Sequence, residues 1–176
     1  VCGFPKNIYY YYKSWWTNED ILHISPHWNW PEKLGKPIDV WVNTNADDVE
    51  LFLNGKSLGK KAMSRNSHLQ WEVNYEPGTL EAVAYKDGKK LTSKVETTTH
   101  PVKVIVVADK NSIQADGKDG IVVNVSIVDE KGRDVPNASN MIYFKLTGDA
   151  KIIGVGNGDP SSHEPDKCAD GAWQRS

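Results

Sequence analysis

In this 176-residue sequence neither sign of charge predominates, and cysteine, phenylalanine and long apolar runs are scarce. Lys and Arg number 21 against 23 Asp and Glu, which gives a formal net charge of -2, and the two signs are interspersed. Such a balance gives no electrostatic reason to expect binding to nucleic acid or to an anionic membrane. No apolar run approaches the roughly 20 residues that cross a bilayer, so the sequence predicts no membrane span.

The two cysteines, Cys2 and Cys168, lie near opposite ends of the chain. Their spacing matches no metal motif and no disulfide framework, so we interpret them as two thiols. The sequence begins at Val1 without a Met and without a signal-peptide pattern, which favours a piece of a longer polypeptide. On that interpretation, the missing signal carries no information about location.

Catalytic and cofactor signatures are also missing. The sequence has no Gly-rich phosphate loop after a strand and no nucleophile elbow. Asp116–Gly120 lacks the ordered oxygen ligands of a calcium loop and carries Lys118 in its middle, which favours turn chemistry. His163 and Cys168 alone are too few ligands for zinc. The sequence therefore predicts no metal, no cofactor and no catalytic residue.

What the sequence does contain is a series of short β patterns. Ile38–Thr44 and Leu69–Val73 alternate apolar and polar residues, which is the period of a half-buried strand. Asn54-Gly55 stands between Val49–Leu53 and Lys56–Gly59 and is a strong hairpin signal. Short strands with frequent turns indicate β-sandwiches. We therefore expect an all-β fold after residue 20.

The polar stretch Thr97–Pro101 has no packing residues and predicts a linker between two sandwiches. The expected units are an N-terminal segment at 1–17, a first sandwich at 18–98 and a second, immunoglobulin-like sandwich at 99–176. Only about four strands are clear in the second unit, against the roughly seven of such a fold, so we expect it to lack its final strand. The tail from Gly154 shows no strand pattern. Large side chains are expected in each core: Trp41, Phe52 and Trp71 in or beside the first, and Val123, Val125 and Phe144 in the second.

The aromatic residues are mostly amphipathic, because seven Trp and seven Tyr accompany only three Phe. Six of them crowd residues 9–16, which suit either a helix after Pro5 or a strand of Tyr and Ile. With aromatics on nearly every face, this segment is expected to be buried against a large partner. In the chain alone we expect a homodimer through it, with Trp28 and Trp30 as the alternative landing site within the chain.

The segment Pro26–Pro31, which reads PHWNWP, has the most functional character. In an extended backbone Trp28 and Trp30 share a face. Paired indoles beside His27 and Asn29 suit a sugar ring and its hydroxyls. The alternative is packing against a neighbouring domain, which is the commoner role of large aromatics. We expect both indoles at a surface rather than deep in the first core.

Several segments resemble bacterial glycoside hydrolase family 2 enzymes of the β-galactosidase type, in the region that follows their catalytic barrel. Gly3–Trp16 resembles the last barrel segment, and Leu22–Trp30 resembles the entry to the next domain. Val49–Gly59 resembles the hallmark hairpin of that domain. Gly154–Pro160 with Ser162-His163-Glu164 resembles a loop of the following immunoglobulin-like domain. The resemblance covers nearly the whole chain.

This resemblance implies a parent that is a retaining exo-glycosidase, most often a β-galactosidase, with both catalytic carboxylates in the barrel. No position here matches either carboxylate, so we expect the chain alone to be inactive, with domains that brace the barrel and shape its sugar pocket. The resemblance also implies that Trp15 and Trp16 wall the sugar site. A periplasmic or cell-surface parent fits the family, although the sequence does not indicate one. The candidate substrate-binding residues are Trp15, Trp16, His27, Trp28 and Trp30.

The alternative is a free-standing carbohydrate-binding or adhesin-like module of immunoglobulin type, since Val128–Gly132 resembles the strand end of bacterial surface repeats. The stretch Tyr9–Trp16 argues against it, because a free binder has no use for so many exposed aromatics whereas a barrel segment needs them. The expected partners are therefore the catalytic barrel of the parent chain and, in second place, carbohydrate.

Overall fold

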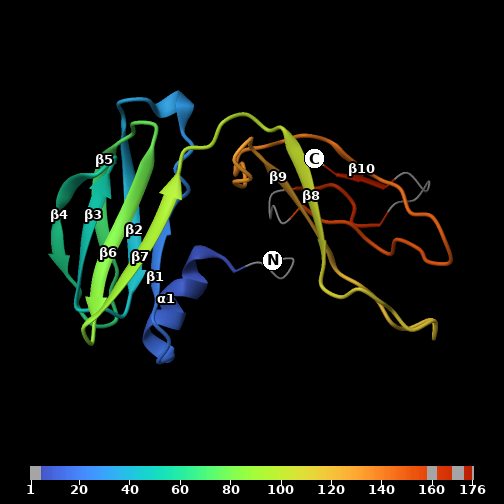
Figure 1. Cartoon of the computed structure of the whole chain (residues 1–176), viewed down its shortest axis with the longest axis horizontal. Coiled ribbons are helices and arrows are strands. Elements are labelled where there is room, and N and C mark those ends of the chain that lie inside the picture. The colour runs from blue at the N-terminus through green and yellow to red at the C-terminus, as the bar shows by residue number, and fades with distance from the viewer. Residues whose placement is uncertain (1–4, 158–161, 168–172, 176) are drawn as a thin grey trace.

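The computed structural model describes residues 5–157, 162–167 and 173–175, and over these residues the chain is built of β-sheets with one α-helix and a short 3-10 helix (Figure 1). The expected all-β sandwich fold is confirmed. Cys2 and Cys168 lie outside the described residues. The elements in chain order are α1 (Asn7–Trp16), β1 (Leu22–Ser25), η1 (Pro31–Lys33), β2 (Pro37–Thr44), β3 (Asp48–Leu53), β4 (Lys56–Ala62), β5 (Leu69–Asn74), β6 (Thr79–Lys86), β7 (Lys89–Glu96), β8 (Lys103–Ala108), β9 (Val123–Val128), β10 (Ile142–Phe144) and β11 (Trp173–Arg175).

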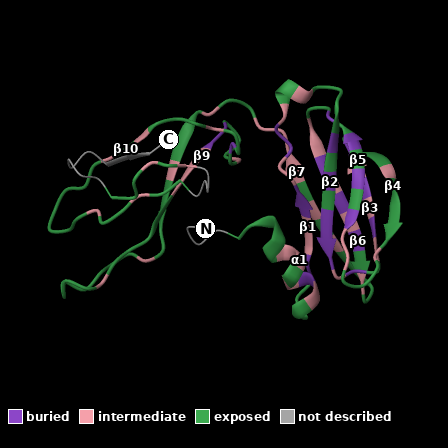
Figure 2. Ribbon diagram, turned by 180° about the vertical axis from the view of Figure 1, so that it is seen from behind, coloured by how far each residue is buried: buried purple, intermediate pink, exposed green. Residues whose placement is uncertain are grey.

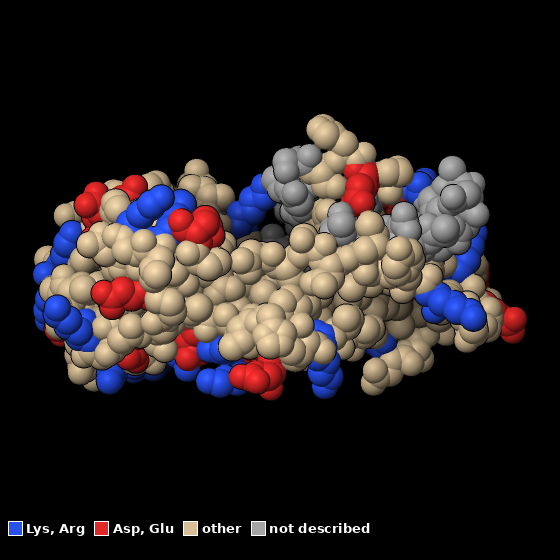
Figure 3. Space-filling model, turned by 90° about the horizontal axis from the view of Figure 1, so that it is seen from above, with Lys and Arg blue, Asp and Glu red and all other residues tan. Residues whose placement is uncertain are grey.

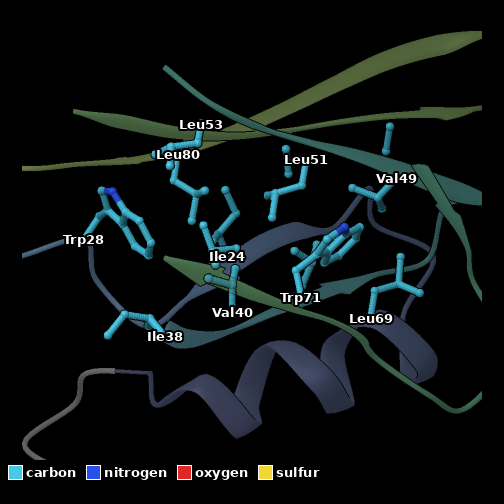
Figure 4. Packing of buried hydrophobic residues seen from close by; sticks show 14 of the residues in the cluster. Ile24, Trp28, Ile38, Val40, Val49, Leu51, Leu53, Leu69, Trp71 and Leu80 are labelled. Carbon is cyan, nitrogen blue, oxygen red and sulfur yellow. The ribbon is translucent and has the colours of Figure 1, made fainter. Parts of the chain in front are cut away.

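The strands from β1 to β7 form two antiparallel sheets that face each other. One has the strand order β1-β2-β5 and the other the order β4-β3-β6-β7. In β3, β5 and β6 every second side chain is buried, which is the pattern of strands that bury one face against a second layer. The buried side chains between the sheets form one cluster (Figure 4): Ile24, Trp28, Ile38, Val40, Val42, Ala46, Val49, Leu51, Leu53, Leu69, Trp71, Val73, Tyr75, Leu80, Ala82 and Ala84.

The hairpin turns follow the sequence signals. Asn54 and Gly55 join β3 to β4 with φ values of 52° and 80°. Asp87 and Gly88 join β6 to β7 with φ values of 49° and 77°. Positive φ at both central residues is what a two-residue turn of this twist requires, and Asn, Asp and Gly tolerate it best. These turns set the register of the second sheet.

The large side chains expected in the first core divide between the two faces of their sheets. Trp71 is buried and Phe52 is half-buried. Trp41 is 45% exposed on the outer face, because its neighbours Val40 and Val42 point inward. The expected core position of Trp41 is therefore wrong.

After Thr97–Pro101, the described strands form two two-stranded sheets, β8-β9 and β10-β11. β11 lies in the tail, where the sequence shows no strand pattern. Val125 and Phe144 are half-buried, whereas Val123 is 46% exposed at the start of β9, so its expected core position is wrong. The physical reason is that a two-stranded sheet, as far as the described residues show, leaves much of both faces uncovered. The buried residues described after position 101 are Val128, Asp129 and Val135 (Figure 2).

Within the described part of the chain, no helix is long and apolar enough to cross a membrane. On the face shown in Figure 3, acidic and basic side chains are interspersed over the first sandwich, at the left of the view. This agrees with the mixed charge pattern of the sequence.

Candidate functional site

The aromatic N-terminal segment forms helix α1, which lies on the outer face of the β1-β2-β5 sheet (Figures 1 and 4). Ten residues are too few for a stable isolated helix in water, so the contacts with the sheet hold it. The Tyr10 ring stacks on the His23 imidazole with centroids 3.6 Å apart. Burial lowers the pKa of His23, which favours the uncharged imidazole in this stack. Ser14, four residues after Tyr10, is also buried, and its hydroxyl donates to the Tyr10 carbonyl oxygen at 2.7 Å.

A second contact joins α1 to the loop before β5. The Tyr11 hydroxyl donates to the carbonyl oxygen of Asn66 at 2.9 Å. Trp15 Nε1 donates to the carbonyl oxygen of Ser67 at 3.2 Å. The helix therefore folds back on the sandwich through His23 and this loop. The alternative landing site at Trp28 and Trp30 is therefore wrong.

The opposite side of α1 carries an uncovered apolar stripe. Ile8, Tyr12 and Trp16 follow each other at intervals of four residues, which places them on one helix face. All three are exposed, together with Tyr9, and Trp16 reaches 78%. The rings of Tyr12 and Trp16 pack at 4.6 Å. The helix thus has one face on the sandwich and a second face available to a partner.

Trp28 does not reach the surface. Its side chain is 0% exposed within the first core, and its ring meets Tyr75 edge-on at 5.1 Å. Its Nε1 donates to the carbonyl oxygen of Glu76 at 3.0 Å, so burial leaves no polar group unpaired. The expected surface position of Trp28 is wrong, because the backbone of Pro26–Pro31 is not a continuous strand that would place both indoles on one face.

Trp30 is half-buried beside His27. The two rings stack at 4.4 Å with 14° between their planes, and Trp30 Nε1 donates to the His27 carbonyl oxygen at 2.8 Å. The Lys33 ammonium lies 4.5 Å from the centroid of the Trp30 ring. Burial lowers the pKa of His27, and the Glu32 carboxylate opposes this shift. The imidazole and the ammonium thus occupy ring surface that a sugar would need.

The candidate residues form two groups rather than one pocket. Trp15 meets Ser67, just before β5, whereas Trp28 meets Glu76, just after β5. The length of that strand therefore separates Trp15 and Trp16 from His27, Trp28 and Trp30. Contact of these five residues with a sugar stays a prediction, and Trp28 has no exposed surface to offer.

Asn29 has a structural role that sequence reasoning missed. Its side chain is 6% exposed. The amide nitrogen donates to Thr98 Oγ1 at 2.7 Å and to Asn137 Oδ1 at 3.1 Å. The amide oxygen accepts from the backbone N–H of Thr98 at 2.8 Å. One side chain of the first sandwich therefore holds both the linker and a residue of the second half.

Asp129 holds the linker from the other side. Its carboxylate accepts from the Thr99 N–H at 3.2 Å, from the Lys131 N–H at 2.9 Å, and from Arg133 Nη2 at 2.6 Å. The Arg133 guanidinium, together with these backbone donors, holds the pKa of Asp129 well below its usual range. Beside the linker lies a hollow of ≈ 480 Å³ lined by residues of both halves.

Asp116 and Asp119 stabilise the turn in which they lie, as expected. Asp116 Oδ1 accepts from the N–H groups of Lys118 and Asp119, both at 2.8 Å. Asp119 pairs with the Lys110 ammonium. Among the described residues, no group of three or more His, Cys, Asp or Glu is placed to hold a metal ion.

Residues 35–92 match a family described as a domain of unknown function (DUF4982), and residues 104–172 match Glycoside hydrolase family 2 C-terminal domain 5. Beta-galactosidase BoGH2A of Bacteroides ovatus is 44% identical over 167 residues, which are 93% of this chain and 19% of that protein. A beta-glucuronidase of Formosa agariphila is 31% identical over 164 residues, which are 90% of this chain and 16% of that protein.

The crystal structure of a glycosyl hydrolase family 2 member from Bacteroides cellulosilyticus superposes with a TM-score of 0.90 at 33% identity, over 98% of this chain and 26% of that chain. The chain spans about a fifth of the length of the curated relatives it matches. The matched region consists of β-sheets and carries the C-terminal domain of the family. The chain belongs to glycoside hydrolase family 2, in whose enzymes it corresponds to accessory β domains of the C-terminal region.

Proposed function

We propose that this chain is the non-catalytic part of a β-galactosidase-like enzyme, in which sandwiches at 18–98 and 99–176 brace a catalytic barrel. The observation that carries the proposal is the 44% identity to a β-galactosidase over 93% of this chain. On this proposal the whole enzyme hydrolyses terminal β-galactosides, and residues 1–17 belong to the end of the barrel. Hydrolysis of β-glucuronides is the second candidate, because a relative with that name matches 90% of the chain.

Helix α1 supports the brace. Its inner face is already held by His23 and by the loop at 66–67. Large aromatics each bury roughly 150–250 Å², and a soluble monomer seldom exposes an apolar patch beyond a few hundred Å². The stripe of Ile8, Tyr12 and Trp16 therefore fits an interface with the barrel. Trp15 and Trp16 are the residues of α1 that we propose to wall the sugar site.

Activity assays test the proposed role. The purified 176-residue chain should release no nitrophenol from aryl β-galactosides. A longer polypeptide that carries a barrel ahead of this chain should do so, and faster than it cleaves aryl β-glucuronides. Faster glucuronide cleavage would select the second candidate. Turnover by the chain alone that disappears when one of its own carboxylates is replaced would contradict the accessory role.

In the chain alone, where no barrel covers the stripe, we propose that a homodimer does. Carbohydrate is a further proposed partner. Sedimentation of the intact chain beside a version that starts at Asn18 tests the dimer. We expect a dimer of the intact chain and a monomer of the shortened one. Trp16→Ala should shift the intact chain toward monomer. Monomers of both versions at the same concentration would rule the dimer out.

A further inference from the structure

An exposed indole on the first sandwich lies outside the α1 stripe on which the proposed brace rests. Trp41 lies on the outer face of the β1-β2-β5 sheet and is 45% exposed. The His68 imidazole stacks on it, with centroids 4.4 Å apart and 20° between the planes. The imidazole covers one ring face, so a ligand would have to approach the other face or the ring edges. The stack holds the indole in one orientation before any ligand arrives.

Polar side chains stand beside Trp41 on the same face. In the antiparallel pairing of β2 with β5, Trp41 lies opposite Gln70 and Asp39 lies opposite Glu72. Directly opposed residues point to the same side of a sheet, as do residues two apart in one strand. Gln70 Nε2 donates to Asp39 Oδ1 at 3.0 Å, so the amide and the carboxylate orient each other.

Helix α1 stabilises the loop that precedes His68. It holds the carbonyl groups of Asn66 and Ser67 through Tyr11 and Trp15. His68 is the next residue in the chain. The helix therefore fixes the loop that places the imidazole against Trp41.

We infer that Trp41, with Asp39, Gln70 and Glu72, forms a binding platform for a neutral glycan. An indole offers an apolar face to the C–H groups of a pyranose ring, and the neighbouring amide and carboxylates offer partners for its hydroxyls. The two carboxylates disfavour uronic acids and phosphorylated sugars. The ammonium of Lys61, at the margin, already donates to the Gln70 carbonyl oxygen. The glycan class rests on membership of a glycoside hydrolase family, and the choice of a galactan as the probe rests on the proposed β-galactosidase activity.

Affinity electrophoresis of the 176-residue chain tests the platform directly. Native gels are cast with soluble pectic galactan, which is neutral, or with polygalacturonate, which is anionic. We expect galactan to slow the chain and polygalacturonate to leave its mobility unchanged. Trp41→Ala should abolish the retardation, and Gln70→Ala should weaken it. Tyr85→Ala is the matched control, because it removes an exposed aromatic from the outer face of the other sheet and should be retarded like the unchanged chain.

Three results would overturn the inference: galactan that fails to slow the unchanged chain, equal retardation of the Trp41→Ala chain, or equal retardation by polygalacturonate. If Trp41 instead contacts the barrel, its replacement would leave the gel mobility unchanged and lower the melting temperature of the longer polypeptide. Far-UV circular dichroism of each variant shows that the fold is kept. Binding is measured without hydrolysis, so a failure here leaves the accessory role standing.

Discussion

The two halves of the chain are both built of β-strands, yet they bury side chains very differently. The first sandwich encloses a single cluster of buried apolar residues that comes from all but two of its seven strands, while the described residues of the second half bury only Val128 and Val135 among their apolar side chains. Isolated two-stranded sheets are marginal in water. We therefore attribute most of the stability to the first half. We expect order in the second half to depend on its contacts with the linker and with the first half.

The largest expected effect follows from removing a core side chain of the first half. Trp28→Ala should cost about 3–5 kcal/mol in the free energy of unfolding, since the indole is fully buried and bonded to Glu76. Urea unfolding followed by circular dichroism measures the loss. The exposed control Tyr85→Ala should change stability by no more than about 0.5 kcal/mol. A similar loss in both variants would contradict the assigned core.

The linker contact gives the next effect. Asn29→Ala leaves the Thr98 N–H and the Asn137 side chain without their partner, at a cost of roughly 1–3 kcal/mol. We expect the first sandwich to stay folded while the linker at 97–101 becomes open to proteases. Limited proteolysis beside the unchanged chain shows this as faster cleavage into two halves. Unchanged cleavage would mean that Asn29 does not couple them.

Low pH should destabilise the second half before the first. The folded-state pKa of Asp129 is depressed, so its contribution is present above the unfolded value of about 3.9 and is lost as pH falls toward the folded value. We expect spectroscopic probes in the second half to lose structure below about pH 4, before those in the first. Asp129→Asn should remove most of this difference. Coincident acid transitions in the unchanged chain would speak against it.

The smallest effect concerns the outward indole. Trp41→Ala should cost no more than about 1 kcal/mol, because the side chain is nearly half-exposed and packs mainly on His68. The comparison with Trp71→Ala on the same sheet sharpens the point, since that indole is buried and its loss should cost about 3–5 kcal/mol. Equal losses, measured by urea unfolding, would place both indoles in the core.

Local patterns explain how much of the fold could be predicted from the sequence. Trp71 alternates with polar Gln70 and Glu72, so its inward direction could be predicted. Trp41 lies two residues from polar Asp39 and two from polar Asn43, so the alternation of Ile38–Thr44 already indicates an outward side chain, and the expected core position disregarded that period. The structure buries the valines, and the indole faces outward.

The candidate site depended on contacts between residues far apart in the sequence. Asn29 reaches Thr98 across 69 residues and Asn137 across 108 residues. No periodicity or motif signals such pairs, and an Asn beside two Trp residues suits a sugar site equally well. The position of Trp28 was missed for the same reason, since its partner Glu76 lies on a different loop. The sequence could not decide between a helix and a strand for residues 9–16, because packing, rather than propensity, holds α1.

Hydrogen–deuterium exchange on the chain alone and within a polypeptide that includes a barrel tests the brace most directly. We expect slow exchange of β2, β3, β5 and β6 in both forms, since the first core protects them either way. We expect α1 to exchange much more slowly in the longer polypeptide, because its stripe of Ile8, Tyr12 and Trp16 becomes covered there. Exchange of α1 that is the same in both forms would contradict the proposal that this chain braces a catalytic barrel.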